Sequence, residues 1–441
     1  MIFLALFSTL AVAYSAASNM SLRQARNYMS AQTAQFAAES GLNYMAEVLR
    51  GINVDAGEAE EDLLLAVANG LAERMDGTAN MGEGEITFVG DTISTPPIAL
   101  NSSGETFQAD IREAGDGALL LEIRGNGQVA AKGVRIAIQP VEGYSPVFDY
   151  GVASKSRIKI SGNPTIKGAN DPSEASILSA TYSDEEAVRI NGNCWLDGDI
   201  CTANPDSHVT ILGNPEIAGK TDWDDIQEHI HIGVGPGEFP EIDPTVFEPF
   251  ATNIVDKHTD TSSDMVLENI RIAAGTNPNF AGNCTIKGVV FVEQPNKVKF
   301  SGNCQLIGVI VTEDAGEDAY NSNYLRFNGN FWSEGVEALP DEPQFSDLKQ
   351  MPGSAILAPG FGVRYQGNVE SINGTIAADK LTFNGNVEGT IYGSLICYSD
   401  SAFEISGNVD VTIDREKYSR VAPGFKLPVQ LVPEGESYEE F

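Results

Sequence analysis

The spacing of hydrophobic residues changes along the chain, and the first part reads as one long helix. The first 22 residues are mostly apolar and carry no charge before Arg23. From there to Leu49 the apolar residues keep a near-helical spacing, with almost nothing to break a helix before Gly41. The pattern predicts a helix of about 50 residues, roughly 75 Å long, that is apolar in its first third and amphipathic afterwards.

The next part, residues 53–142, mixes one short helix with strands. Leu64, Leu71 and Met75 fall on one side of an amphipathic helix predicted over residues 61–75. Runs of alternating or β-branched residues follow, separated by Gly, Asp and Asn, and they indicate a small antiparallel sheet. We expect a small α+β head that ends at a junction near residue 145.

After residue 150 the pair Gly-Asn recurs within one frame, apolar–x–Gly–Asn–x–x–(mostly apolar). Several gaps between successive pairs are close to 20 residues, and the others are 27, 30, 38 and 69. The asparagines of these pairs are Asn163, Asn193, Asn214, Asn283, Asn303, Asn330, Asn368, Asn386 and Asn408.

Two structures could produce this repeat. Asn and Gly are common turn residues, so a set of independent hairpins is the simpler interpretation. Independent hairpins, however, do not require the same flanking pattern nine times. A period of about 20 residues with short strands and one fixed turn is typical of a parallel β-helix. We therefore predict a mainly β chain, with a right-handed parallel β-helix over residues 143–425, an insertion near 221–275, and an acidic tail over 426–441.

The frame also predicts what each asparagine does. The residue after it, such as Cys284 or Val387, shares an apolar face with the residue two further on, so that face points into the coil. The asparagine then lies at a corner, where its backbone can approach the left-handed region with help from the preceding glycine. Coils stack ~4.8 Å apart, so the corner amides would form a ladder, and losing a buried one would cost about 1–3 kcal/mol. The repeat is predicted to be structural rather than a binding motif.

Charge and cysteine content narrow the classes of partner. The chain has 62 acidic and 27 basic residues among 441, a net charge of −35, which disfavours nucleic acid and anionic lipid headgroups. Five cysteines are too few for a disulfide framework. Cys284 and Cys304 are expected to stack as thiols, because ~4.8 Å is too far for a bridge. Cys194 and Cys201 could close a small loop.

Candidate chemistry is sparse. His229 and His231, in "EHIH", could present two imidazoles to a metal, but no third ligand is evident. Glu313, Asp314 and Asp318 could bind calcium, yet the usual Asp-x-Asp-x-Asp-Gly pattern is missing, which favours an exposed acidic loop. No carboxylate pair, nucleophile elbow or phosphate loop can be placed. We expect no catalytic residue, no metal and no cofactor, and therefore not an enzyme.

A resemblance adds to this reading. Residues 22–45, "LRQARNYMSAQTAQFAAESGLNYM", resemble the N-terminal helix of PilX-type minor pilins of type IV pilus systems and, more loosely, the large minor pseudopilin of type II secretion. The Gln- and Ala-rich stretch and the box at 38–41 carry the resemblance, which covers about fifty residues. It implies a pilin-like head and a helix that packs against other pilin-like subunits. The residues it would place in that contact are Leu22, Met29, Phe36, Glu39, Leu42, Met45 and Leu49.

The N-terminus departs from the pilin pattern. Pilins carry a basic leader that ends in glycine and usually a glutamate early in the mature helix, and this sequence has neither. We expect that the sequence begins inside the helix; a cleavable secretion signal is the alternative. We favour an inner-membrane anchor over a cleaved signal for the apolar residues 1–20, with the bulk of the chain extracytoplasmic, in the periplasm or at the cell surface.

Together these expectations describe a membrane-anchored structural protein with three domains: a helix over 1–52, a head over 53–142 and the β-helix. By resemblance it would be a minor pilin-like component of a filament or its assembly complex, with the β-helix available for adhesion or partner contact. The repeat style also resembles bactofilins, so a self-polymerising scaffold is an alternative. A carbohydrate-active β-helix enzyme is a second alternative.

Overall fold

The computed structural model describes residues 2–54, 56–100, 105–115, 117–127, 129–183, 185–235, 239–417 and 422–441. The chain divides into two compact units. The head unit contains Met1–Tyr144 together with Leu427–Phe441, and the second unit contains Ser145–Lys426. In the sequence, therefore, the second unit is an insertion between two parts of the head.

The head unit is a helix packed on an antiparallel sheet, as the change of period predicted. Its helices are α1 (Ile2–Arg50) and α2 (Ala56–Met75). The order of the main sheet is β1-β34-β7-β6-β5-β3-β2, with β35 beside β7 and β4 beside β5. The strands are β1 (Asn53–Val54), β2 (Thr87–Val89), β3 (Thr92–Ser94), β4 (Ile98–Ala99), β5 (Thr106–Gly115), β6 (Ala118–Asn126), β7 (Ala131–Glu142), β34 (Val429–Pro433) and β35 (Glu439–Glu440).

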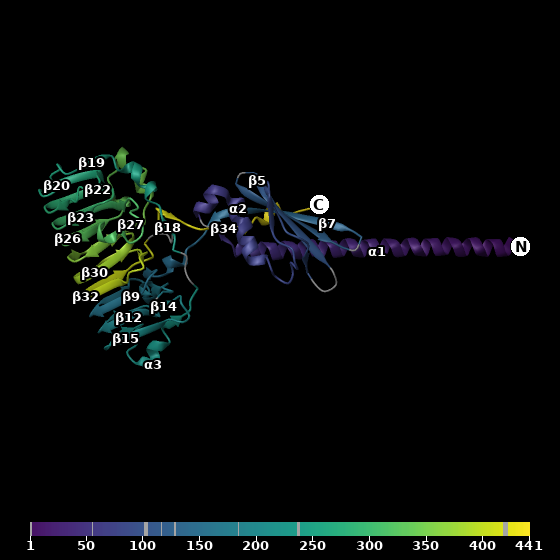
Figure 1. The fold of residues 1–441 in the computed structure, drawn as a ribbon, viewed down its shortest axis with the longest axis horizontal. Coiled ribbons are helices and arrows are strands. Elements are labelled where there is room, and N and C mark those ends of the chain that lie inside the picture. The colour runs from purple at the N-terminus through teal and green to yellow at the C-terminus, as the bar shows by residue number, and fades with distance from the viewer. Residues whose placement is uncertain are drawn as a thin grey trace. The chain divides into compact units, whose positions relative to one another are not determined.

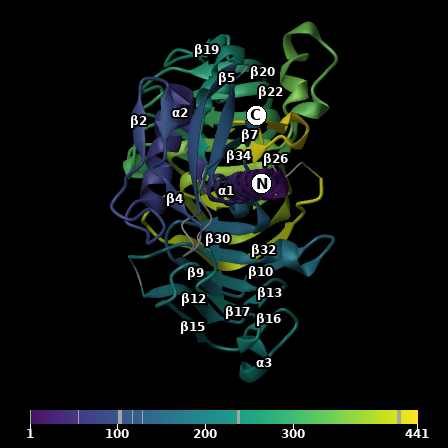
Figure 2. The same cartoon turned by 90° about the vertical axis from the view of Figure 1, so that its right-hand side faces the viewer.

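Alternation within each strand builds the core of the head. In β5, Phe107, Ala109 and Ile111 are buried while the residues between them are partly exposed. This buried face packs against the C-terminal part of α1, where Met45 and Leu49 have no exposed surface. Figure 2 looks along α1, with β5, β7 and β34 labelled beside it.

The end of the chain belongs to this sheet, so the prediction of an acidic tail over residues 426–441 is wrong. β34 pairs with β7 and also with β1, and β35 pairs with β7. Arg135 on β7 binds Glu439. Two of the acidic residues that suggested a solvated tail, Glu439 and Glu440, are exposed on the short strand β35, where their charge does not oppose folding. The head is therefore closed by a segment nearly 300 residues away from β7 in sequence.

The second unit is a parallel β-helix, which confirms the predicted fold class. Within the described residues it forms a 24-stranded sheet in which the paired strands run parallel. Its first segment contains β8 (Val152–Ser154), β9 (Ile158–Gly162), β10 (Thr165–Gly168), β11 (Ile177–Ser179), β12 (Glu186–Gly192), β13 (Trp195–Leu196), β14 (Ile200–Thr202), β15 (His208–Leu212), β16 (Glu216–Ile217), the helix α3 (Trp223–Gln227) and β17 (Ile230–Ile232).

The second segment supplies the remaining coils. Its strands are β19 (Asn253–Val255), β20 (Met265–Ile272), β21 (Asn279–Phe280), β22 (Asn283–Val292), β23 (Lys297–Phe300), β24 (Asn303–Thr312), β25 (Tyr324–Phe327), β26 (Asn330–Glu334), β27 (Ser354–Tyr365), β28 (Asn368–Val369), β29 (Ser371–Asn373), β30 (Thr375–Tyr392), β31 (Leu395–Cys397) and β32 (Phe403–Ile413). Outside the coils, β18 (Glu241–Ile242) pairs antiparallel with β33 (Phe425–Lys426). The insertion predicted near 221–275 is thus too long, because β17, β19 and β20 form coils that lack the Gly-Asn pair.

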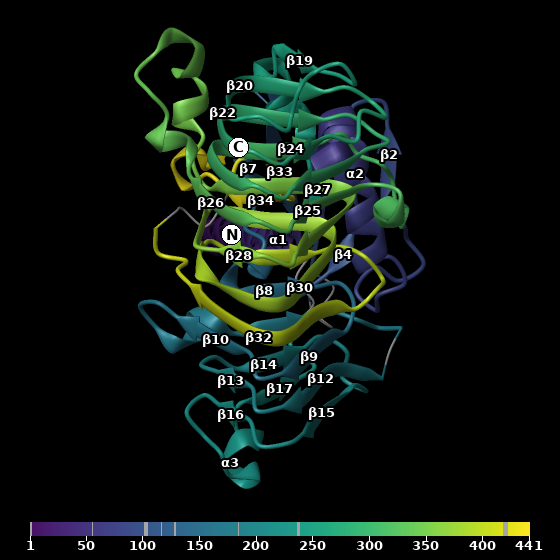
Figure 3. The ribbon, with the colours of Figure 1, turned by 90° about the vertical axis from the view of Figure 1, so that its left-hand side faces the viewer.

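The coils do not stack in the order of the sequence. The last coil of the second segment pairs with the first coil of the first segment: Ile405 on β32 is in register with Ile160 on β9. In Figure 1, yellow β32 accordingly lies beside blue β9, and Figure 3 shows the same neighbours from another side. Read along the stack, the order begins at β19, runs to β32, and continues from β9 to β17. The chain therefore enters and leaves the β-helix at an internal seam.

Aromatic rings fill the interior of the second segment. Phe300, Phe327 and Tyr365 occupy equivalent positions on successive coils. Their ring centroids are 4.9 and 4.7 Å apart and the planes are nearly parallel, so the side chains stack along the axis. Beyond the seam the equivalent residues are Ile160 and Ile190. At this one interior position the second segment is therefore mostly aromatic, whereas the first is aliphatic.

Candidate functional sites: the corner ladder and the seam pocket

The glycine of each Gly-Asn pair is required by the stacking of the coils. A Cβ atom on Gly302 would lie well inside contact distance of the Gly282 carbonyl oxygen of the neighbouring coil. The same holds for Gly192 against Gly162, and Gly192 also has a φ of 133°. Only a residue without a side chain lets the backbones approach this closely. The left-handed conformation that we predicted for the asparagines lies instead on some of these glycines, namely Gly162, Gly192, Gly213 and Gly407. Leaving Asn386 aside, none of the ladder asparagines has a positive φ.

The asparagines form the predicted ladder. Its amides hydrogen-bond from coil to coil and continue across the seam between Asn163 and Asn408. In each bond the Nδ2 of one asparagine donates to an Oδ1 in the neighbouring coil. The pairs, donor first, are Asn193–Asn163 at 3.2 Å, Asn163–Asn408 at 3.4 Å, Asn368–Asn330 at 3.1 Å, Asn330–Asn303 at 2.8 Å and Asn303–Asn283 at 3.0 Å.

All of these bonds donate in one direction, and the series ends on a carboxylate. Asn283 donates from both its backbone nitrogen and its Nδ2 to Asp264, each at 3.0 Å. These two bonds lower the pKa of Asp264. A group that only accepts suits the last position, because nothing further along remains for it to donate to. Asp264 was missed in the sequence because no glycine precedes it; the register of Met265 with Cys284 is what assigns it to the ladder.

For two of the predicted ladder asparagines the structure shows no ladder hydrogen bond. Asn214, one coil beyond Asn193, makes no side-chain hydrogen bond among the described residues, and the side chain of Asn386 lies outside them. The cost of about 1–3 kcal/mol was predicted for a buried amide. The bonded asparagines are exposed, so that cost does not apply to them. The ladder lines an open polar groove of about 500 Å³ between Asp264 and Asn368.

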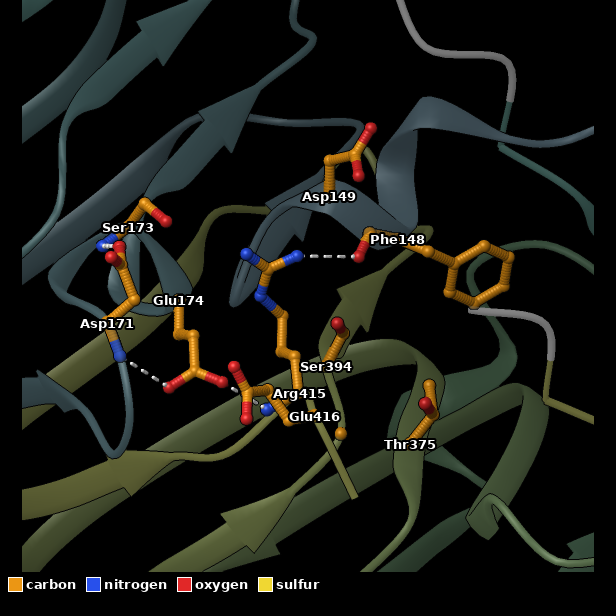
Figure 4. Close-up of a pocket in the computed structure, with 10 residues that line it drawn as sticks. Phe148, Asp149, Asp171, Ser173, Glu174, Thr375, Ser394, Arg415 and Glu416 are labelled. Atoms are coloured by element: carbon orange, nitrogen blue, oxygen red, sulfur yellow. Dashed lines mark hydrogen bonds between the residues drawn. The ribbon is translucent and has the colours of Figure 1, made fainter. Parts of the chain in front are cut away.

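A second pocket, of about 600 Å³, lies at the seam where the chain enters and leaves the β-helix (Figure 4). The 3-10 turn Pro146–Asp149 contributes Phe148, and the turn Pro172–Ala175 contributes Glu174. Arg415, just after β32, joins the two, because its backbone nitrogen donates to Glu174 Oε1 at 2.8 Å and its Nη1 donates to the Phe148 carbonyl at 3.1 Å. The pocket therefore surrounds a clasp between the first and last coils.

Glu174 is suited to hold this clasp and not to transfer protons. Its side chain is only 3% exposed, and burial on its own would raise the pKa. Hydrogen bonds from the backbone of Asn170 and Arg415, and from other donors around it, outweigh burial and lower the pKa. The carboxylate is thus ionised at neutral pH, with its lone pairs occupied by fixed donors.

The cysteines and histidines considered as candidate sites have the following surroundings. All five cysteines are free and buried, so Cys194 and Cys201 are not bridged, and Cys284 is in register with Cys304 as a thiol. Burial raises the pKa of Cys194 to about 12, which keeps that thiol protonated. His229 and His231 both contact Asp199, at 2.8 and 3.0 Å. In the part of the chain that the structure describes, no group of three or more His, Cys, Asp or Glu residues is arranged to hold a metal ion.

The predicted helix-contact residues separate into two groups. Leu42, Met45 and Leu49 are buried in the core of the head itself, so they are not available to another subunit, contrary to the prediction. Leu22, Met29 and Phe36 are each more than half exposed, and their contact with other subunits stays a prediction. Glu39 is partly buried and accepts a hydrogen bond from Gln35 at 2.9 Å. Among the described residues, no helix is both long and apolar enough to cross a membrane.

Comparisons with known proteins were made by sequence and by structure. No protein-family model matches the sequence, and no curated protein matches it. A solved structure to which the chain is similar is the competence-associated pilin ComZ from Thermus thermophilus, with 12% sequence identity and a TM-score of 0.31. The similarity covers 93% of this chain and 97% of that one. We draw no functional conclusion from a similarity at this level.

Proposed function

We propose that this chain is a non-enzymatic structural subunit of a type IV pilus-like filament or of its assembly complex. In this role α1 packs among the helices of other pilin-like subunits, and the β-helix is presented for adhesion or partner contact. We also propose that residues 1–20 hold the chain in the inner membrane before assembly, with the remainder extracytoplasmic. The resemblance of residues 22–45 to PilX-type minor pilins supports the proposal.

One observation carries it: α1 exposes large apolar side chains along most of its length. A helix with such side chains exposed on several sides is not stable alone in water and needs other helices or lipid to cover it. Only its last part is covered by the head, through residues such as Met45. The exposed side chains are Phe3, Phe7, Leu10, Val12, Tyr14, Met20, Leu22, Tyr28, Met29 and Phe36.

Photo-crosslinking in cells that assemble the filament tests the proposal. A photoreactive amino acid at Met29 or Phe36 should give adducts with another pilin-like subunit, because these side chains are 67% and 64% exposed on α1. The matched control is Val266, which is 64% exposed on the β-helix. Adducts that are absent from both helix positions, or equally frequent at Val266, would contradict the proposal.

The alternatives predict different behaviour of the purified full-length chain. A bactofilin-like scaffold would form filaments on its own, with β-helices joined end to end. A carbohydrate-active enzyme would shorten a polysaccharide on incubation. Electron microscopy and analysis of reducing ends distinguish both from a structural subunit, for which we expect neither result.

A further inference from the structure

One face of the β-helix carries cations that have no carboxylate partner. Register places Lys299, Arg326 and Arg364 at equivalent outward positions on three neighbouring coils. The adjacent outward positions on these coils and the next are aligned in the same way, and they include two further lysines. We call this group the cationic face; its residues are Lys297, Lys299, Tyr320, Tyr324, Arg326, Arg364 and Lys380.

Two tyrosine rings contact four of the five cations. The guanidinium carbons of Arg326 and Arg364 both lie 5.0 Å from the centroid of the Tyr324 ring. Lys297 Nζ is 5.8 Å from the same ring, which makes it a shared cation–π platform. On the next coil, Lys380 Nζ lies 5.2 Å from the ring of Tyr320. Four of the five cations are therefore positioned by neutral rings and not by carboxylates.

The cations of the cationic face are held without ion pairs. None of the five cations is within ion-pair distance of a carboxylate in the described part of the chain, although acidic residues outnumber basic ones by 62 to 27. Like charges on coils ~4.8 Å apart repel one another and destabilise the fold. The Nε of Arg326 is also buried without a hydrogen-bond acceptor. An anion bound across the coils would relieve the repulsion.

The cationic face has a definite end. On the coil after Arg364 the equivalent residue is Thr382, and on the coil after that it is Glu404. The aligned cations thus span a limited stretch on one side of the sheet, at β23, β25 and β27. Most of these side chains are partly buried, whereas Lys297 is exposed.

We propose that the cationic face binds an anionic polysaccharide whose sugars each carry one carboxylate, a polyuronate. The inference rests on the proposed function and deepens it by naming the class of ligand that the β-helix binds. Guanidinium groups bind carboxylates in a bidentate manner, and Arg326 and Arg364 would each bind one carboxylate of the polysaccharide. The sugar hydroxyls would meet the hydroxyl groups of Tyr324 and Thr382 beside them.

The spacing favours a polyuronate over nucleic acid. Successive cations recur at the coil repeat of ~4.8 Å, which is close to the length of one sugar unit in an extended polysaccharide. Duplex DNA carries one charge for every ~1.7 Å of its axis and would be repelled more strongly by a chain whose net charge is −35. Bases would need open aromatic faces on which to stack, and cations already lie over the rings of Tyr320 and Tyr324.

Binding of the purified full-length chain to polygalacturonate tests the inference. We expect polygalacturonate to bind, with an affinity that falls as salt is added, and neutral dextran not to bind. Replacing Lys297 and Lys299 by Gln together should weaken binding by about tenfold or more, because two charged contacts are lost. The matched control, Lys220→Gln with Lys257→Gln, removes the same charge from exposed loops and should leave binding unchanged.

Three results would overturn the inference: no binding of polygalacturonate, equal binding by the Lys297/Lys299 variant and the unchanged chain, or tighter binding of a DNA oligonucleotide. The last would assign the face to nucleic acid. Lys297 and Lys299 are outward residues, so far-ultraviolet circular dichroism should report an intact fold in this variant. Because the assay uses the isolated chain, its failure does not bear on the crosslinking of α1, and a failed crosslink does not bear on this assay.

Discussion

Two sets of side chains repeat along the coils of the second segment, one inside the β-helix and one at its corner, and they contribute very differently to stability. The inner set is the aromatic stack, in which Phe300 and Phe327 are almost completely buried. The outer set is the asparagine ladder, whose amides are bonded but open to water. Burial of a ring removes a large apolar area from water, whereas an exposed amide exchanges one hydrogen bond for another. A conspicuous repeat therefore marks a position in the coil and does not measure its contribution to stability.

The largest effect is expected from the inner set. Phe327 contacts three rings, with centroids 4.9 Å away at Phe300, 4.7 Å at Tyr365 and 4.4 Å at Phe331. Phe327→Ala leaves a cavity in a fully buried stack and should lower the free energy of unfolding by about 3–5 kcal/mol. Ile211→Ala is the comparison, since Ile211 is only partly buried in the terminal coil and should cost less. Denaturant unfolding followed by circular dichroism measures both, and equal losses would contradict the contrast.

The corner glycines come next. Gly302→Ala forces a Cβ against the Gly282 carbonyl of the neighbouring coil, so the two backbones must separate. Such overpacking typically costs about 1–3 kcal/mol. Gly235→Ala serves as the control because nothing lies within 4 Å of a Cβ at that position. If both substitutions had the same effect on unfolding, close stacking would not be the reason that glycine precedes asparagine.

These corners also show how far the sequence could be read. The period, the inward face after each asparagine and the amide ladder follow from local alternation, so a pattern of about 20 residues was sufficient to predict them. The pairing of Ile405 with Ile160 could not be predicted, because parallel coils with the same repeat are interchangeable partners. The same limit applies to the seam clasp, since Glu174 and Arg415 are 241 residues apart and belong to no repeat.

The end of the chain was misread for a related reason. Counting charges suggested a solvated tail, but only the sheet shows that Leu431 has no exposed surface and completes the core of the head. The cationic face could not be predicted from the sequence either. Lys299, Arg326 and Arg364 are separated by unequal loops, and only the register between coils brings them together.

A buried carboxyl group beside the loop 314–318 gives the second unit a dependence on pH. Burial, together with the charges of Asp318, Glu317 and Asp314, raises the pKa of Asp379 to about 6. Because the folded pKa lies above the unfolded one, this group stabilises the fold most below about pH 4, and that contribution is lost as the pH rises through 6. Asp379→Asn should flatten the profile between these values, a change of about 1–2 kcal/mol in unfolding free energy. A variant with an unchanged profile would exclude Asp379 as its source.

The smallest effect on the free energy of unfolding is expected at the asparagine ladder, and it tests whether the ladder has a fixed donor direction. Asn303→Ala breaks two exposed amide bonds and should cost about 0.5–1 kcal/mol. Asn303→Asp should cost more, because the ladder donates in one direction and a carboxylate in its middle would face the Oδ1 of Asn283. Rotating the Asn283 amide would not help, since its oxygen would then meet Asp264, which is where the ladder accepts a carboxylate. The extra cost of Asn303→Asp over Asn303→Ala should vanish below about pH 4, where the new carboxyl group is protonated and can donate. Unfolding at pH 7 and pH 3 measures it; an equal cost for both substitutions at pH 7 would mean that the ladder has no fixed direction.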